Sequence, residues 1–101
     1  MMTVEHVDSD GNTWEIPFFQ SDDIETLLRE RADEVHSAIM DSLTNLIVDK
    51  LDQVPSFSVN EFVFEVNIDT AQDNLDKCLD YYEDTEQFEE CSRIMTLKSK
   101  L

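Results

Sequence analysis

The segment DTAQDNLDKCLDYYED, residues 69–84, has two distinct faces when it is wound as an α-helix. At about 100° per residue, one narrow face carries only carboxylates. Its members are Asp69, Asp73, Asp76, Asp80 and Glu83. The opposite face is apolar and consists of Ala71, Leu75, Cys78, Leu79 and Tyr82. This pattern predicts an amphipathic helix that packs one face inward and presents a row of acids to solvent.

A second amphipathic run follows, and the two runs mirror each other. Residues at matching distances from the 84–85 bond form two pairs: Leu75 with Ile94, and Cys78 with Cys91. Antiparallel helices joined near that bond bring such pairs to the same level, so we expect a helical hairpin over residues 70–100. The two cysteines are then neighbours. Without a Cys-x-x-Cys spacing, and in acidic surroundings, they are typical of buried free thiols and not of a redox pair.

The start of the chain predicts a β-hairpin over residues 3–18. Apolar and polar residues alternate on both sides of a turn, in which Gly11 supplies the positive φ that such turns require. The acids of this turn also suggest a calcium loop of the EF-hand type. An EF-hand loop that starts at His6, however, places Pro17 where the bidentate glutamate belongs. We therefore interpret the acids as part of a tight turn.

A single long helix is expected over residues 22–52, because no glycine or proline interrupts this segment. Asp22 is the expected N-cap and Glu25 its capping-box partner. A helix of this length spans about 45 Å, which is more than one small sheet needs as a cover. Its apolar stripe therefore either covers the sheet and the terminal hairpin, or overhangs them and supports a homodimer.

A strand is expected over residues 57–68, where the hydrophobic period changes to two. One face, which we expect to be buried, carries Phe62, Phe64, Val66 and Ile68. These elements predict a single α+β domain over residues 1–101, with the order ββ-α-β-αα. Its sheet has three antiparallel strands, made of the hairpin and this strand. The long helix packs on the sheet, and the helical hairpin follows.

The charge of the chain restricts its partners. Twenty-four acids against seven bases give a net charge of −17, which repels nucleic acid and anionic membranes alike. The expected partner is a basic, nucleic-acid-binding protein. A single glycine is too few for a loop that cradles phosphate, so P-loop and Rossmann chemistry are excluded. The lack of a signal-like segment or a membrane-spanning apolar run, together with two cysteines, predicts a cytoplasmic location.

Catalysis finds little support in the residues. His6 and His36 are the only histidines, and neither has an evident serine or cysteine partner. A zinc site would need two ligands besides the cysteines, and the histidines lie far from them in sequence. We expect no enzymatic activity, no cofactor and no metal site.

The helical hairpin resembles a known motif. The matching residues are Leu75, Leu79, Phe88-Glu89, Cys91-Ser92, Ile94 and Leu97. They resemble the helical-hairpin motif at the end of the UvrB and UvrC repair proteins, with Cys91 and Ser92 in place of two small alanines. The chain departs from that pattern at three places. Tyr82 and Glu83 replace a small pair, Glu86 replaces an apolar residue, and Met95-Thr96 replace Arg-Asp. The resemblance implies a hairpin that binds another protein.

Three interpretations of the acids follow. In the first, the protein mimics nucleic-acid charge and occupies the cleft of a DNA- or RNA-binding protein, as small phage-encoded inhibitors of restriction, CRISPR or transcription do. The residues expected to bind the partner are Asp69, Asp73, Asp76, Asp80, Glu83, Asp84, Glu86, Glu89 and Glu90. In the second, the protein is an adaptor or assembly factor that binds through its apolar helical faces, and the acids only keep it soluble. In the third, the acids form a solvated surface without a recognition role. We favour the first.

Overall fold

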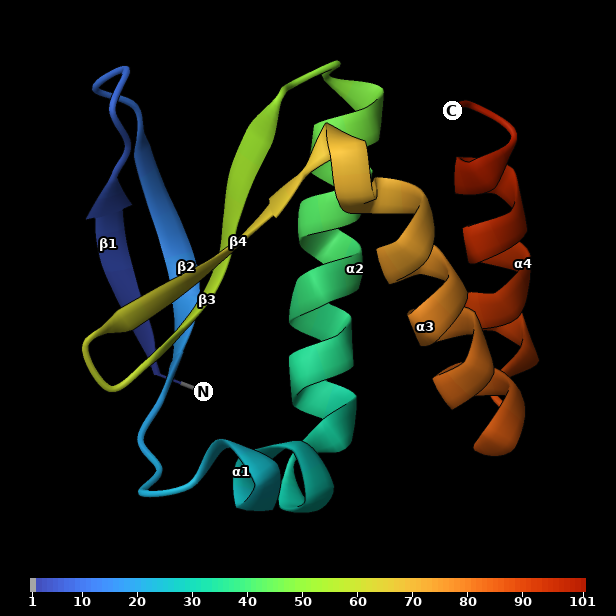
Figure 1. Ribbon diagram of the computed structural model, residues 1–101, viewed down its shortest axis with the longest axis horizontal. Helices are drawn as coiled ribbons and strands as arrows, with labels where there is room; N and C mark the ends of the chain where they lie inside the picture. Colours follow the sequence, from blue (N-terminus) through green and yellow to red (C-terminus); the bar gives the residue numbers. More distant parts are fainter. Residues whose placement is uncertain (1) are drawn as a thin grey trace.

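The computed structural model describes residues 2–101, and within them it contains four strands and four α-helices. In chain order these are β1 (Thr3–Val7), β2 (Thr13–Phe19), α1 (Ile24–Glu30), α2 (Ala32–Val48), β3 (Gln53–Val59), β4 (Phe62–Asn67), a 3₁₀ turn (Ile68–Thr70), α3 (Ala71–Asp84) and α4 (Phe88–Lys98). Figure 1 shows α2 between the sheet on one side and α3 and α4 on the other. The predicted α+β class is confirmed.

The four strands form one mixed sheet in the order β1-β2-β3-β4. The pairs β1–β2 and β3–β4 are antiparallel, whereas β2 and β3 run parallel over only two residue pairs, Phe18 with Ser58 and Phe19 with Val59. The prediction of a three-stranded antiparallel sheet is therefore wrong. Parallel strands need a long crossover connection, and the segment that contains α1 and α2 provides it.

The strand that the prediction missed is β3, with the sequence QVPSFSV. All of its residues except the first are buried, so no exposed polar face marks it as a strand of its own. Pro55 also argues against a strand, but here it lies at an irregularity, because the pairing with β4 shifts register between Pro55 and Phe57. The hydroxyl of Ser56, at the same irregularity, is buried and has no hydrogen-bond partner within residues 2–101.

The predicted strand over residues 57–68 is in fact two strands that meet at a tight turn. Val59 of β3 pairs with Phe62 of β4, which leaves a two-residue connection. Asn60 adopts a positive φ of 54° in this turn, a conformation that asparagine tolerates better than most residues. The chain therefore reverses in the middle of the segment that was expected to run straight.

The expected burial of the aromatic face of this strand is also wrong. Phe62 is 73% exposed, Phe64 41% and Ile68 39%, and only Val66 is buried. The physical reason is the position of β4 at the edge of the sheet. The helices cover the end of β4 that carries Val66, which joins the core beside α2 and α3, and they leave the other end in solvent.

The single long helix expected over residues 22–52 is wrong as well. Arg31, with φ −125° and ψ 37°, interrupts it and separates α1 from α2. The break lets both helices pack on one small cluster, in which Leu27 of α1 and Val35 of α2 meet Phe19. The N-cap of α1 is Asp23, one residue later than expected, and its carboxylate accepts a hydrogen bond from the amide of Glu25.

The expected overhang of the long helix disappears with this break. α2 has 17 residues, so its length is about 26 Å. Most of its apolar side chains are buried within the chain, and Val48, at its last turn, is exposed. The homodimer through the long helix stays a prediction, but the overhang on which it rested is absent.

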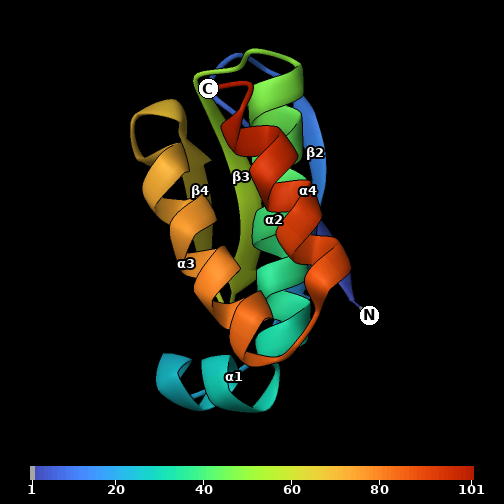
Figure 2. The ribbon, with the colours of Figure 1, turned by 90° about the vertical axis from the view of Figure 1, so that its right-hand side faces the viewer.

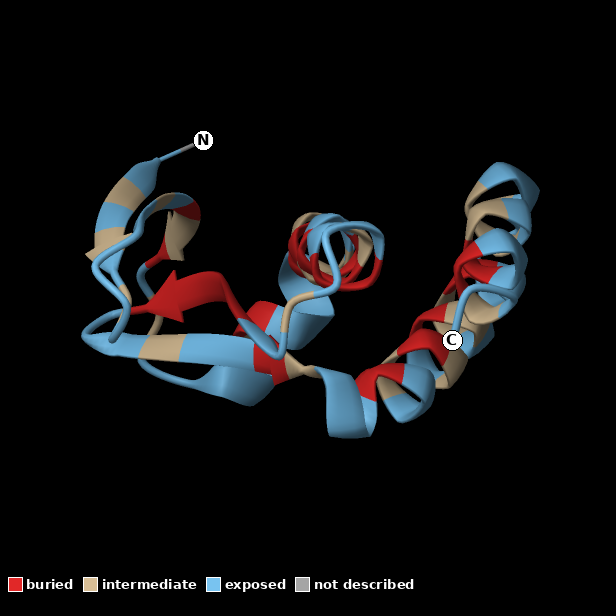
Figure 3. Cartoon of the chain, turned by 90° about the horizontal axis from the view of Figure 1, so that it is seen from above, coloured by how far each residue is buried: buried red, intermediate tan, exposed pale blue. Residues whose placement is uncertain are grey.

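The larger of two core clusters joins every layer of the fold. It consists of Met40, Leu43, Leu46, Ile47, Val54, Val66, Ala71, Leu75, Cys78, Tyr82, Ile94 and Leu97. Figure 3 shows these buried segments of the sheet, α2, α3 and α4 facing one another. The helical hairpin is therefore held to the rest of the chain by shared apolar burial, the main favourable contribution to folding.

Candidate functional site

The helical hairpin places the predicted acids on its outer surface. α3 buries Ala71, Leu75, Cys78 and Tyr82, and the carboxylates of this helix lie on the opposite face. Asp73, Asp80, Glu83, Asp84, Glu86 and Glu89 are all exposed, whereas Asp76 and Glu90 are half-buried. Asp69 is exposed but belongs to the 3₁₀ turn before α3. We call these nine residues the acidic surface.

Two members of the acidic surface have cationic partners. The ammonium of Lys98 lies 2.5 Å from the carboxylate of Asp76, and the guanidinium of Arg93 lies 3.5 Å from that of Glu90. Within residues 2–101, the other seven acids take part in no ion pair and no side-chain hydrogen bond. These seven carboxylates are therefore available to a cationic partner, and their mutual repulsion favours binding one.

The tip of the hairpin is attached to α2 by a polar cluster. The hydroxyl of Tyr81 and the side-chain amide of Gln87 both donate hydrogen bonds to the carboxylate of Asp33, the latter at 3.1 Å. The ring of Tyr81 also stacks on that of His36, with 3.8 Å between the ring centres. This cluster links the loop between α3 and α4 to the first turns of α2. The part of the hairpin that carries the acidic surface is therefore held in a fixed position on α2.

The cluster shifts the pKa values of its members. Hydrogen bonds from Tyr81 and then Gln87 lower the pKa of Asp33. Partial burial, followed by the hydrogen bond to Asp33, raises the pKa of Tyr81 to about 12. The hydrogen bond between them therefore forms when the Asp33 carboxyl is ionised and the Tyr81 hydroxyl is protonated.

Tyr81→Phe is expected to lower the melting temperature by a few degrees at neutral pH, because it removes the hydroxyl and keeps the ring on His36. Because the pKa of Asp33 is lowered in the folded protein, the contribution of its carboxylate to folding stability is lost as the pH falls through this lowered pKa. The raised pKa of Tyr81 means that its contribution is lost as the pH rises from 10 towards about 12. Melting curves of both proteins across this range should therefore converge at the acidic and alkaline ends. Equal melting temperatures at pH 7 would show that the bond adds no stability.

A second attachment fixes α4 to α2. The guanidinium of Arg93 donates to the hydroxyl of Thr44 at 2.8 Å and lies 3.3 Å from the carboxylate of Asp41. The same side chain reaches Glu90 one turn earlier on α4. Arg93 thus holds α4 against α2 and partly neutralises the carboxylates of Asp41 and Glu90.

An apolar groove lies on the hairpin beside the acidic surface. Leu79 on α3, and Phe88, Cys91 and Met95 on α4, line a groove of about 650 Å³ together with Glu83 and Ser92. Phe88 is 64% exposed and Met95 56% exposed. Figure 2 shows the two helices side by side, facing the viewer. Sequence reasoning missed this groove. The spacing of Phe88, Cys91 and Met95, which places them on one stripe of α4, was the available signal.

The cysteines contribute to packing. Both are free thiols, with Cys78 buried and Cys91 half-buried against the main core. Burial raises the pKa of the Cys78 thiol to about 11, so it is protonated at neutral pH and a poor nucleophile.

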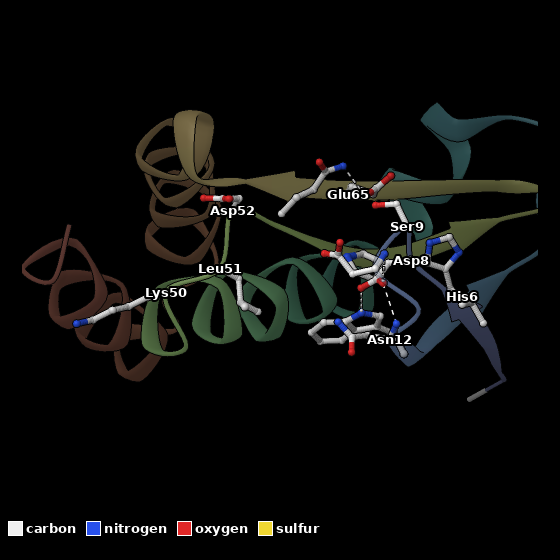
Figure 4. Close-up of a pocket in the computed structure, with 13 residues that line it drawn as sticks. His6, Asp8, Ser9, Asn12, Lys50, Leu51, Asp52 and Glu65 are labelled. Atoms are coloured by element: carbon white, nitrogen blue, oxygen red, sulfur yellow. Dashed lines mark hydrogen bonds between the residues drawn. The ribbon is translucent and has the colours of Figure 1, made fainter.

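A second cavity of about 540 Å³ lies between the β1–β2 turn and the start of β3 (Figure 4). The carboxylate of Asp8, which lines this cavity, accepts three hydrogen bonds. They come from the amides of Asp10 and Asn12, at 3.0 and 2.9 Å, and from the indole of Trp14 at 2.8 Å. These bonds, with that from Trp14 the largest cause, lower the pKa of Asp8. Asp8 therefore braces the turn as an ionised carboxylate.

The two histidines lie in different parts of the fold. His6 lines the cavity at the β1–β2 turn, whereas His36, on α2, stacks against Tyr81 of α3. The ring Nδ1 of His36 is 2.7 Å from the carbonyl oxygen of Ala32, one turn earlier on the helix. Among residues 2–101, no three histidine, cysteine, aspartate or glutamate side chains are grouped in a way that could hold a metal ion.

No helix in the described part of the chain is long and apolar enough to cross a membrane. Comparison of the chain with protein-family models, with curated proteins and with solved structures finds no match. The resemblance of the hairpin to the motif of the UvrB and UvrC proteins therefore stays a prediction.

Proposed function

We propose that this protein is a non-enzymatic inhibitor that mimics nucleic-acid charge and occupies the binding cleft of a basic, nucleic-acid-binding protein in the cytoplasm. The proposal rests on one observation: seven of the nine carboxylates of the acidic surface have no cationic partner within residues 2–101. Such a surface attracts the same lysine and arginine side chains that bind phosphates.

The spacing and support of the carboxylates favour this role. Successive acids on α3, such as Asp73, Asp76 and Asp80, are three or four residues apart, so they rise about 5 Å along the helix axis at each step. This is of the same order as the spacing of phosphates along one nucleic-acid strand. The helix is held by its buried face and by the Tyr81–Asp33 bond, so little order has to be created on binding.

A second candidate function is that of an adaptor that binds through apolar contacts. The exposed side chains of Phe88 and Met95 in the groove between α3 and α4 favour it. Large apolar side chains in a groove with a charged rim are typical of protein-binding surfaces. In this alternative, the acids add solubility and the groove carries the affinity.

Capture of partners from a lysate of the source organism, followed by a salt gradient, separates the two functions. Mimicry predicts release at moderate salt and displacement by added DNA or RNA, because both compete for the same cationic side chains. Apolar docking predicts retention through the gradient and loss of capture in a Phe88→Ser, Met95→Ser variant. A partner that stays bound in high salt and in excess nucleic acid would contradict the mimicry proposal.

A further inference from the structure

A row of aromatic rings crosses the sheet, and its last ring, on the edge strand β4, is exposed to solvent. One ring comes from each of three neighbouring strands: Phe19 of β2, Phe57 of β3 and Phe64 of β4. The centres of Phe19 and Phe57 are 5.9 Å apart, and those of Phe57 and Phe64 are 5.0 Å apart. The first two rings are buried, whereas Phe64 is 41% exposed. The row thus runs across the sheet and stops at its last strand.

The backbone of this edge is also open. β4 is the last strand in the sheet order, and within residues 2–101 it pairs with β3 alone. Beside Phe64, on the same face of the strand, Phe62 is 73% exposed. Three of the six residues of β4 are exposed, and Figure 3 shows exposed segments along this strand in pale blue. A strand with unpaired backbone groups and exposed aromatic side chains is a template for the addition of a further strand.

We propose that the free edge of β4 binds an extended, cationic segment of a partner protein by strand addition. The added strand would continue the row of rings, with apolar side chains beside Phe62 and Phe64. Its alternate side chains would lie on the other face of the sheet, where Glu65 is exposed, and near Glu61 in the adjoining turn. The matching partner therefore alternates apolar residues with lysine or arginine. This site lies on the sheet, apart from the acidic surface, and does not depend on the proposed mimicry.

Charge favours such a partner over a second copy of the chain. Two β4 strands paired edge to edge would bring Glu61 and Glu65 of both copies together, and each copy carries a net charge of −17. Like charges that face each other across paired strands are destabilising. The same carboxylates attract a cationic strand, so they oppose self-association and select the partner.

The test uses a short synthetic peptide that alternates lysine and valine, titrated into the full chain. We expect binding, with the largest amide chemical-shift changes and added protection from hydrogen exchange at residues 62–67. A peptide of the same sequence in which every backbone amide is N-methylated keeps its charge but loses the hydrogen-bond donors of both strand edges. It should bind at least about tenfold more weakly. Equal binding of the two peptides would overturn the proposal, because it would show attraction by charge alone.

Two variants, each at an exposed phenylalanine, locate the site. Phe62→Ser on β4 should weaken peptide binding by about fivefold or more, whereas Phe88→Ser on α4 should change it by less than about twofold. Both side chains are mainly exposed, so both variants are expected to fold. A larger loss with Phe88→Ser would place the peptide in the groove of the hairpin and contradict the proposal. Dimerisation of the chain through β4 without peptide would contradict it as well.

Discussion

Leu43→Ala is expected to lower the free energy of unfolding by about 2–5 kcal/mol, because it opens a cavity where the layers of the fold meet. Leu43 lies on α2, is fully buried, and belongs to the cluster that also contains Val66 of β4, Leu75 of α3 and Ile94 of α4. A domain of this size is stable by only about 5–15 kcal/mol in total. The loss is therefore large, and urea denaturation monitored by circular dichroism measures it.

Met95→Ala is the matched control, since Met95 is an apolar side chain of α4 that is 56% exposed. Its substitution should change the unfolding free energy by less than about 0.5 kcal/mol. Both variants should unfold in a single transition, because the cluster around Leu43 joins the sheet, α2 and the helical hairpin. A separate early transition of the hairpin would show that this cluster does not couple the layers.

Replacement of Asp73 and Asp80 by asparagine, and of Glu83 by glutamine, is expected to weaken binding to the captured partner at least about tenfold at physiological salt. The exchange keeps the size of the side chains and removes three charges from the acidic surface. The variant should also lose part of its salt dependence, because fewer ion contacts remain to be screened. Titration of the purified partner at several salt concentrations measures both effects.

A control with the same change in net charge separates local recognition from general attraction. Asp10, Asp22 and Asp49 are exposed acids outside the helical hairpin, and their joint replacement by asparagine also removes three charges. It should reduce affinity much less than the triple change on α3. Equal losses would mean that the partner responds to the overall charge and that the acidic surface has no special role. No loss in either variant would leave apolar docking as the better explanation.

The helical hairpin could be predicted from the sequence because its information is local. Ala71, Leu75, Cys78 and Tyr82 recur at helical spacing, and the structure buries all four. The exposure of most of the predicted acids follows from the same geometry, since they lie on the opposite face of α3. A periodic pattern of this length leaves one way to bury its apolar face, so the helix and its outer carboxylates were determined together.

The central strand and the helix break could not be predicted in this way. β3 carries a proline and is buried along almost its whole length, and its short alternation of Ser56-Phe57-Ser58-Val59 runs on into that of β4, so the pattern does not separate the two strands. The segment around Arg31 contains no glycine or proline to predict a break. The chain departs from the helix there because Leu27 and Val35 can then both pack against Phe19. Both features depend on contacts between distant residues.

The features of the candidate sites also fall into those that local sequence determines and those that depend on contacts between distant residues. The sequence by itself determined the net charge of −17, the two faces of α3 and the resulting row of carboxylates, since each depends on composition or on local helical spacing. Only the tertiary structure decided that Lys98 and Arg93 neutralise Asp76 and Glu90, and that Asp33 holds Tyr81. The tertiary structure also decided that Phe62 and Phe64 are accessible to solvent, because the burial of a strand's face depends on which strands and helices lie beside it.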